Sequence, residues 1–80
     1  MIKLTRHAKN NMRLYKITKD DIKHVIEQAE EIEVEKDKFI AIKKIKNKFQ
    51  NLPLKIVYSK IEDMNIIITA YPIRKLHKGR

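Results

Sequence analysis

The sequence predicts an α+β domain with a short N-terminal strand, two helices and then a four-stranded antiparallel meander. Apolar residues recur at helical spacing in the first third of the chain, and the period changes to two from Glu31 onward. Turn residues separate the later apolar segments. Helices that precede such a run of strands pack on one side of the resulting sheet. The 80 residues are enough for a single domain, 1–80, with one core.

The first strand is expected at Ile2 to Leu4, and Thr5 can cap a helix that runs to about Tyr15. A second helix has a clearer start, because Thr18 and Asp21 form a pair like a capping box. Its apolar stripe consists of Ile22, Val25, Ile26 and Ala29. The two helices are therefore joined by a tight connection.

Four strands are expected next, at 31–35, 39–45, 54–59 and 65–71. Asp37 and Lys38 suit the first turn, and 47–51 is a polar loop. Pro53 belongs at the start of its strand because proline cannot donate a hydrogen bond to a sheet ladder. Glu62 and Asp63 form the last turn before the final strand.

Composition excludes several classes of protein. The chain has no cysteine, which excludes disulfides and cysteine-based zinc sites, and its three histidines show no metal-ligand spacing. We therefore expect no metal and no other cofactor. The first ten residues lack the continuous apolar region of a signal peptide, and no apolar run could span a bilayer, so we expect a cytoplasmic protein without a membrane partner.

The formal net charge of +9 is unevenly distributed along the chain. Residues 1–19 carry six basic and no acidic side chains, whereas 20–37 carry two basic and eight acidic ones. Residues 38–61 then carry seven basic and no acidic side chains. A positive face built from these blocks would attract RNA or DNA. Lysines on exposed strands can equally serve solubility, and the charge pattern alone does not decide between the two interpretations.

Alternation of side chains predicts which residues share a face of the last two strands. We expect Ile66, Ile68 and Ala70 beneath the helices, together with the preceding strand's buried set, Leu54, Ile56 and Tyr58. That register places Lys55, Thr69 and Tyr71 on the opposite face. A slip by one residue would bury the Lys55 ammonium, which is costly without a partner.

The cations near this face suit a phosphate. Arg74 follows the last strand, and Lys43 or Lys44 can join from the neighbouring strand, so the predicted phosphate ligands are Thr69, Arg74, Lys43 and Lys44. Lysine and arginine stabilise the extra negative charge of a phosphoryl transition state, and a tyrosine or histidine can transfer protons. Taken singly, each of these residues also has a plain structural explanation as a solvated charge or a β-branched surface residue.

The N-terminal segment carries a motif, Thr5-Arg6-His7-Ala8 with Met12 four residues later, and the last strand ends Thr69-Ala70-Tyr71. This pattern resembles a small bacterial and archaeal domain that begins Ser/Thr-x-His-Ala-x-x-Arg-Met and ends in a Thr-x-Tyr strand. That domain is similar to the RelE/ParE toxin superfamily, whose fold has the order of elements expected above. The resemblance covers roughly residues 4–71.

Resemblance to RelE-like toxins implies a metal-independent endoribonuclease that cleaves RNA, in some cases on the ribosome, and is held inactive by a cognate acidic antitoxin. It implies catalytic roles for His7 and Tyr71, to which the chemistry of the open face adds Lys55. The sequence departs from the pattern at Asn11 and Tyr15, where the similar domain has arginines. Either catalysis is absent, or nearby cations, Arg6, Lys9 and Arg13, take the place of those arginines.

Two other functions remain open. The chain resembles ParE proteins as well, which implies a non-enzymatic toxin that binds a DNA-handling protein. The docking element would then be Ile73 to Arg80, in the basic C-terminal tail that begins at about residue 72. A catalytically inactive nucleic-acid-binding module is the third interpretation, and strong salt dependence of binding would be its mark.

Overall fold

The computed structural model describes residues 2–73 and confirms the predicted order of elements. Strand β1 (Ile2–Leu4) is followed by helices α1 (Arg6–Tyr15) and α2 (Lys19–Gln28). The remaining strands are β2 (Glu31–Glu35), β3 (Lys38–Lys44), β4 (Pro53–Ile61) and β5 (Met64–Pro72), with a short helical turn at Phe49–Asn51 between β3 and β4.

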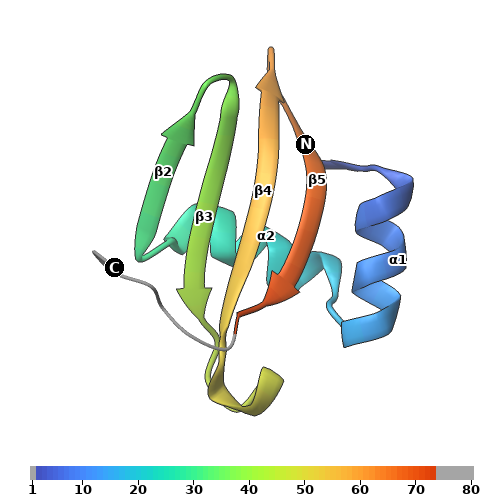
Figure 1. Ribbon diagram of the computed structural model, residues 1–80, viewed down its shortest axis with the longest axis vertical. Coiled ribbons are helices and arrows are strands. Elements are labelled where there is room, and N and C mark those ends of the chain that lie inside the picture. The colour runs from blue at the N-terminus through green and yellow to red at the C-terminus, as the bar shows by residue number, and fades with distance from the viewer. Residues whose placement is uncertain (1, 74–80) are drawn as a thin grey trace.

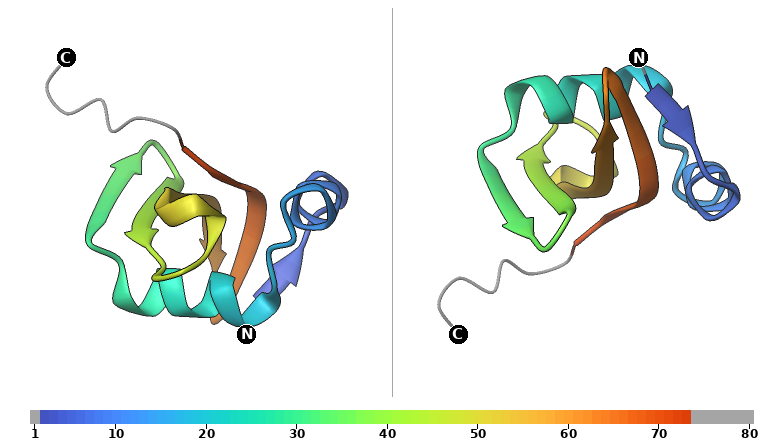
Figure 2. Two further views of the ribbon diagram at one scale, coloured as in Figure 1. Left: turned by 90° about the horizontal axis from the view of Figure 1, so that it is seen from below. Right: turned by 90° about the horizontal axis from the view of Figure 1, so that it is seen from above.

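The five strands form one mixed sheet in the order β1-β5-β4-β3-β2. Strands β2 to β5 make the expected antiparallel meander, and each strand pairs with the next along the chain. The structure adds that β1 joins the sheet beside β5 and runs parallel to it, with Ile2 opposite Asn65 and Leu4 opposite Ile67. The first and last strands are therefore neighbours: Figure 1 shows β2 to β5 side by side, and the right view of Figure 2 shows β1 beside β5.

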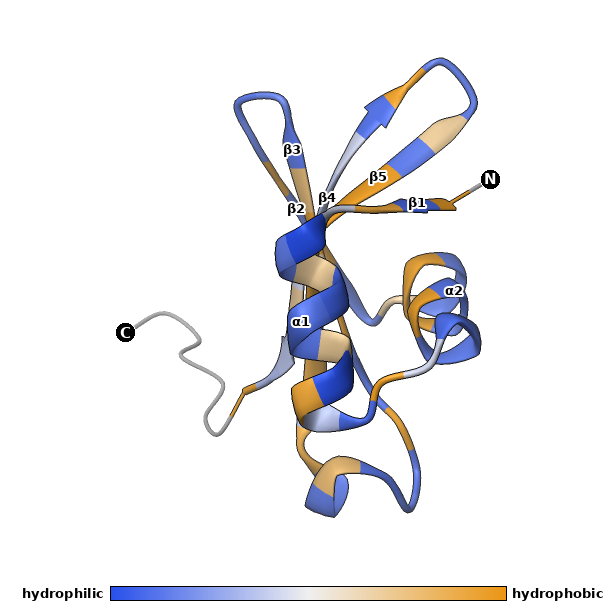
Figure 3. Ribbon diagram, turned by 90° about the vertical axis from the view of Figure 1, so that its right-hand side faces the viewer, coloured by the Kyte–Doolittle hydropathy of each residue, from blue (hydrophilic) through white to orange (hydrophobic). Residues whose placement is uncertain are grey.

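The helices have different positions relative to this sheet. Helix α2 packs on β3 and β4 and covers one face, as the two end views in Figure 2 show. Helix α1 instead lies along the edge of β5, beyond the end of β1, and Figure 3 shows it from the outside. The main core lies between α2 and the sheet, and its fully buried side chains include Ile22, Val25, Leu54, Ile56 and Ile67.

Both helix starts use the predicted caps. The Thr5 hydroxyl accepts a hydrogen bond from the backbone N–H of Ala8 at 3.1 Å. At α2, Asp21 N–H donates to the Thr18 hydroxyl and Thr18 N–H donates to the Asp21 carboxylate, each at 3.0 Å. This reciprocal capping box satisfies two backbone donors that a helix end otherwise leaves unpaired. The shorter aspartate side chain is sufficient for it.

The Asp21 carboxylate also holds the β3–β4 loop, because it accepts a hydrogen bond from Lys48 Nζ at 2.6 Å. Asp21 is only 7% exposed. Burial raises the pKa of this carboxyl. The hydrogen bonds from Lys48 and from the Thr18 backbone, together with the lysine charge, lower it by more than burial raises it, so the pKa is below its usual value. The carboxylate is therefore ionised and joins α2 to the loop.

One predicted pattern in β5 is wrong. Thr69 lies opposite Val57 and Ile67 opposite Tyr58, so Ile68 is an extra residue, a β-bulge. The bulge shifts the alternation by one residue, and Ile67, rather than Ile66 or Ile68, is buried beneath α2 together with Ala70. Ile66 lies opposite Ser59, on the other face. The expected sets therefore hold only after the bulge, from Thr69 onward.

Within residues 2–73, no helix is both long and apolar enough to cross a bilayer.

Candidate functional site

The face of the sheet opposite α2 carries the residues that the sequence singled out. We call it the open face and define it by three groups of side chains across the sheet. The first group, on β2, is Glu31, Glu33 and Glu35; the second, on β3 and β4, is Ile40, Ile42 and Val57; the third, on β4 and β5, is Lys55, Thr69 and Tyr71. One border is thus acidic, the middle is aliphatic and the other border is polar and basic.

Lys55 and Tyr71 form the centre of the polar border. They are directly opposite each other in the β4–β5 ladder, and both are partly exposed. Lys55 Nζ lies 5.7 Å from the centroid of the Tyr71 ring, within the range of a cation–π contact. An ammonium and a phenol hydroxyl are therefore presented together on adjacent strands of a hydrogen-bonded sheet.

Thr69 lies on the same face one pair further along, opposite Val57. Its hydroxyl oxygen accepts a hydrogen bond from Asn11 Nδ2 of α1 at 3.1 Å. The same amide is within 3.2 Å of the Ala70 carbonyl oxygen, to which it also donates. Since a hydroxyl can donate while it accepts, the Thr69 proton is available to an anion on the open face.

Helix α1 borders the site through Asn11, which in the sequence stands out only as a departure from a motif. His7 lies one turn before Asn11, so the two residues share a side of the helix. The His7 side chain is exposed in the first turn. Arg6 is also exposed but is five positions from Asn11, about 140° around the helix axis. His7 is therefore on the site's side of α1, and Arg6 is not.

The two lysines expected from β3 lie on different faces. Lys43 is opposite Leu54 on the α2 side, where its Nζ forms an ion pair with Glu30 at 3.6 Å. Lys44 is exposed and has the alternation of the open face. Only Lys44 is thus placed near Lys55. Arg74, the remaining predicted phosphate ligand, lies outside the described residues.

Strand β2 carries the acidic side chains of the open face. Only Glu35 has a lysine, Lys38, directly opposite. Glu31 and Glu33 are opposite Ile42 and Ile40. The glutamates therefore form an acidic border of the open face, on the far side of the aliphatic middle from Lys55.

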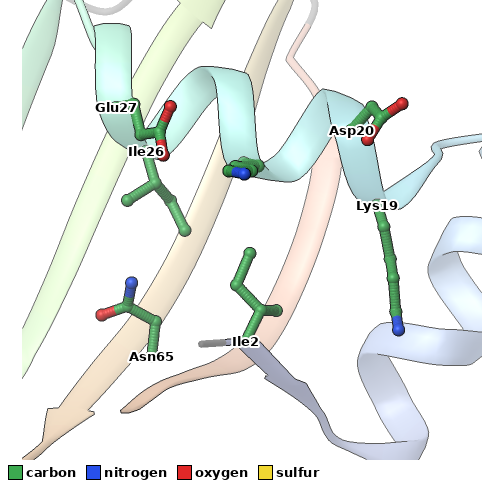
Figure 4. A pocket seen from close by; sticks show the side chains of 7 residues that line it. Ile2, Lys19, Asp20, Ile26, Glu27 and Asn65 are labelled. Atoms are coloured by element: carbon green, nitrogen blue, oxygen red, sulfur yellow. The ribbon is translucent and has the colours of Figure 1, made fainter. Parts of the chain in front are cut away.

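A separate pocket of about 360 Å³ lies away from the open face, between α2 and the β1–β5 pair (Figure 4). Ile2 and Ile26 point into it from opposite walls, and Asn65 lies at its base. The rim has both signs of charge, with Lys19 and Lys23 beside Asp20 and Glu27. None of the residues predicted for the site lines this pocket, and its mixed charge does not favour a polyanion.

No group of three or more histidine, cysteine, aspartate or glutamate side chains within residues 2–73 is arranged to hold a metal ion.

Comparison with known proteins places the chain in one family. Residues 4–72 match the family described as a domain of unknown function (DUF4258), and since the match covers most of the sequence, the chain belongs to that family. No curated protein matches the chain significantly. No solved structure does so either. The matched range begins at the residue before Thr5 and ends with β5, so it contains α1 and the polar border of the open face.

Proposed function

We propose that this domain is a metal-independent endoribonuclease toxin of the RelE/ParE type, and that the polar border of the open face is its active site. The observation that carries the proposal is the arrangement of Lys55, Tyr71 and Thr69, which come from two adjacent strands and share one face. A cation and two hydroxyl groups on a rigid surface meet the requirements of phosphoryl transfer by positioning and electrostatics.

The proposed reaction is intramolecular. The ribose 2′-oxygen attacks the adjacent phosphorus, the bond from phosphorus to the 5′-oxygen breaks, and the products are a 2′,3′-cyclic phosphate and a 5′-hydroxyl. The 2′-hydroxyl loses a proton to a base and the departing 5′-oxygen gains one from an acid; Tyr71 and His7 are the candidates for these roles. Lys55 stabilises the charge on the phosphoryl oxygens, and Thr69 donates a hydrogen bond to one of them.

The biological setting belongs to the same proposal. The RNA would be cleaved in the cytoplasm, free or on the ribosome, and a cognate acidic antitoxin would hold the toxin inactive. A chain of net charge +9 attracts a polyanion and an acidic partner by the same long-range field. Competition between antitoxin and RNA for the polar border would account for inhibition.

A second candidate is RNA binding without cleavage. The observation that favours it is the hydrogen bond from Asn11 to Thr69, because a neutral amide occupies the position next to the site where the similar domain has an arginine. Loss of that cation removes a source of transition-state stabilisation but leaves a basic binding surface. The same assay separates the two candidates.

The test is cleavage of RNA by the purified protein. We expect cleavage of single-stranded RNA in a buffer with chelator, products with 2′,3′-cyclic ends, and a loss of about 100-fold or more in rate for Tyr71→Phe. Tyr58→Phe is the matched control, since Tyr58 is 3% exposed in the core of the same sheet. It should retain the wild-type rate if its fold is intact.

Several results would contradict the nuclease. Activity that disappears in chelator would point to a contaminating or metal-dependent enzyme. Binding with strong salt dependence but no cleavage, on free RNA and on programmed ribosomes alike, would establish the second candidate instead. Growth arrest with intact transcripts and induced DNA damage would favour a ParE-like toxin that binds a DNA-handling protein.

A further inference from the structure

A cavity of about 320 Å³ at one end of the sheet has no role in the function proposed above. It lies where α1 ends, β5 ends and the β3–β4 loop turns back, and it is lined by Tyr15, Phe49, Gln50, Leu52 and Pro72. Its volume is within the range of pockets that take small organic ligands, roughly 300–1,000 Å³. Two aromatic side chains in so small a space suit a flat, unsaturated ligand.

The loop that forms one wall is held in an unusual backbone conformation. Phe49, Gln50 and Asn51 have φ angles of 54°, 55° and 64°, three consecutive left-handed residues without a glycine. That region is disfavoured because Cβ approaches the following carbonyl oxygen, and it is rarely adopted by consecutive residues. Hydrogen bonds from Asn51 N–H to the Lys48 carbonyl and from Leu52 N–H to the Phe49 carbonyl, both 2.9 Å, hold the turn. Strained backbone of this kind is concentrated at functional sites.

The ring of Phe49 is also fixed from the side. Lys48 Nζ lies 5.5 Å from its centroid and is held there by the Asp21 carboxylate at 2.6 Å. The aromatic wall is therefore positioned before any ligand arrives, which lowers the entropy cost of binding.

The sequence next to the lining residues is basic, although Lys48 is paired with Asp21. Residues 44–48 contain three lysines and no acidic residue, and Lys16 follows Tyr15 directly. Pro72, which forms the other wall, directly follows Tyr71 but is opposite Leu54, on the α2 side of the sheet, so the cavity lies around the end of β5 from the polar border of the open face. A ligand that extends from that border to the cavity would meet cations first and aromatic rings at the end.

We propose that this cavity binds one unpaired nucleobase of a single-stranded RNA whose phosphates contact the polar border of the open face. Proteins bind unstacked bases by stacking them on aromatic side chains beside cations that contact the backbone, and both elements are present. The exposed Gln50 amide can donate to and accept from a base edge. The inference rests on the RNA-binding part of the proposed function but not on cleavage.

The experiment measures binding of a short single-stranded RNA in which every ribose is 2′-O-methylated, so that no 2′-hydroxyl can attack. A series of the same RNA carries an abasic nucleotide at each position in turn. We expect one abasic position to weaken binding by wild-type protein about tenfold, and Tyr15→Leu to weaken binding of the intact RNA by a similar factor. When Tyr15→Leu protein binds the RNA with that abasic position, affinity should be little lower than with either change alone, because both changes remove the same stacked pair.

The matched control is Leu14→Ala, since Leu14 is 69% exposed on the same helix and does not line the cavity. It should bind the intact RNA as wild type does. Phe49→Leu provides a second variant that keeps an apolar side chain in place, and circular dichroism verifies the fold of each. Tyr15→Leu should not change the slope of affinity against salt, because no charge is removed.

The inference is overturned if Tyr15→Leu and Phe49→Leu both bind the intact RNA normally, or if no abasic position is coupled to them. It is also overturned if these variants impair only the binding of a protein partner. Coupling without any cleavage of unmodified RNA would reject the nuclease and retain the base pocket. Cleavage of unmodified RNA without coupling would retain the nuclease and reject the base pocket.

Discussion

The two edges of the sheet are treated differently. Along β5, β1 pairs with residues 65–67. The Thr5 hydroxyl, at the start of α1, lies 2.9 Å from the Ile67 carbonyl oxygen. Further along the same edge, the Asn11 amide of α1 donates a hydrogen bond to the Ala70 carbonyl oxygen. Along β2, no described residue pairs with the outer edge. Ile32 and Val34, on the α2 side of β2, are 52% and 64% exposed.

The β5 edge is covered by other parts of the chain, whereas the β2 edge is left unpaired within the described residues. At the covered edge, Asn11 holds Thr69 of the candidate active site through a hydrogen bond. The open edge is shielded against pairing with other chains by its glutamates, since charged side chains discourage edge-to-edge association. If RNA binds as proposed, the same glutamates disfavour it on their half of the open face and favour the half that carries Lys55.

The largest expected effect is at the polar border of the open face, next to the covered edge. Lys55→Ala should lower the rate of RNA cleavage about 100-fold, because in the proposed reaction the ammonium beside Tyr71 would stabilise the charge of the transition state. Lys60→Ala is the matched control: its Nζ lies 5.6 Å from the Phe39 ring, on the α2 side of the same strand. Single-turnover cleavage measures both, and equal losses would show that only net charge matters.

The next effect concerns the attachment of the β3–β4 loop to α2. Asp21→Ala should lower the free energy of unfolding by about 2 kcal/mol, because it removes one half of the capping box and the partner of Lys48. Asp20→Ala, at an exposed neighbouring position, should have a much smaller effect. Urea unfolding at neutral pH measures the difference.

The pH dependence of Asp21 follows from the lowered pKa. Its stabilisation is fully present above the unfolded pKa, near 3.8, and is lost as the pH falls through the lower folded value. The stability difference between wild type and Asp21→Ala should therefore shrink as unfolding is measured at progressively lower pH. A difference that grew on acidification would contradict the ion pair.

A smaller effect is expected for the cover of β5. Asn11→Ala should reduce the free energy of unfolding by about 1 kcal/mol, because the Ala70 carbonyl and the Thr69 hydroxyl lose a donor. Asn10→Ala is the matched control, because it brings the same gain in helix propensity as Asn11→Ala but removes none of the described hydrogen bonds. If both variants unfold at the same urea concentration, the edge contact contributes nothing to stability.

The smallest effect is at the acidic border. Glu33→Gln should strengthen binding of uncleavable RNA about twofold at low salt, since it removes a like charge from the open face. Glu27→Gln removes the same charge from the exposed side of α2 and should change affinity less. Fluorescence anisotropy at two salt concentrations measures both variants. Identical gains would mean that the RNA responds to net charge and not to the open face.

The sequence predicted most elements because their local signals agree with the fold. The Thr18–Asp21 capping box and the alternating apolar residues of β4 are local features, and both are present as expected. The shared face of Lys55, Thr69 and Tyr71 also followed correctly, since burial of Lys55 would be costly and Ala70 pairs with Ile56 beyond the bulge.

The remainder depended on tertiary contacts. The run Ile66, Ile67, Ile68 is apolar in either register, so no local signal revealed the bulge at Ile68. The contact from Asn11 to Thr69 spans 58 residues and requires the position of α1 at the edge of β5. The left-handed turn contains no glycine, so the sequence carries no local signal for it. Lys43 was assigned to a face only by the β3–β4 register.

The parallel pairing of β1 with β5 has a consequence for synthesis of the chain. Thr5 contacts the carbonyl oxygens of Ile67 and Ile68, 62 and 63 residues away, so these contacts cannot form until the last strand has left the ribosomal tunnel. Contacts between residues so far apart in the sequence slow folding, because the entropy of closing the loop is lost before the contacts stabilise the fold. The polar border of the open face, which needs Thr69 and Tyr71 of β5, therefore forms only after the emerging chain has delivered its fifth strand to the strand that was made first.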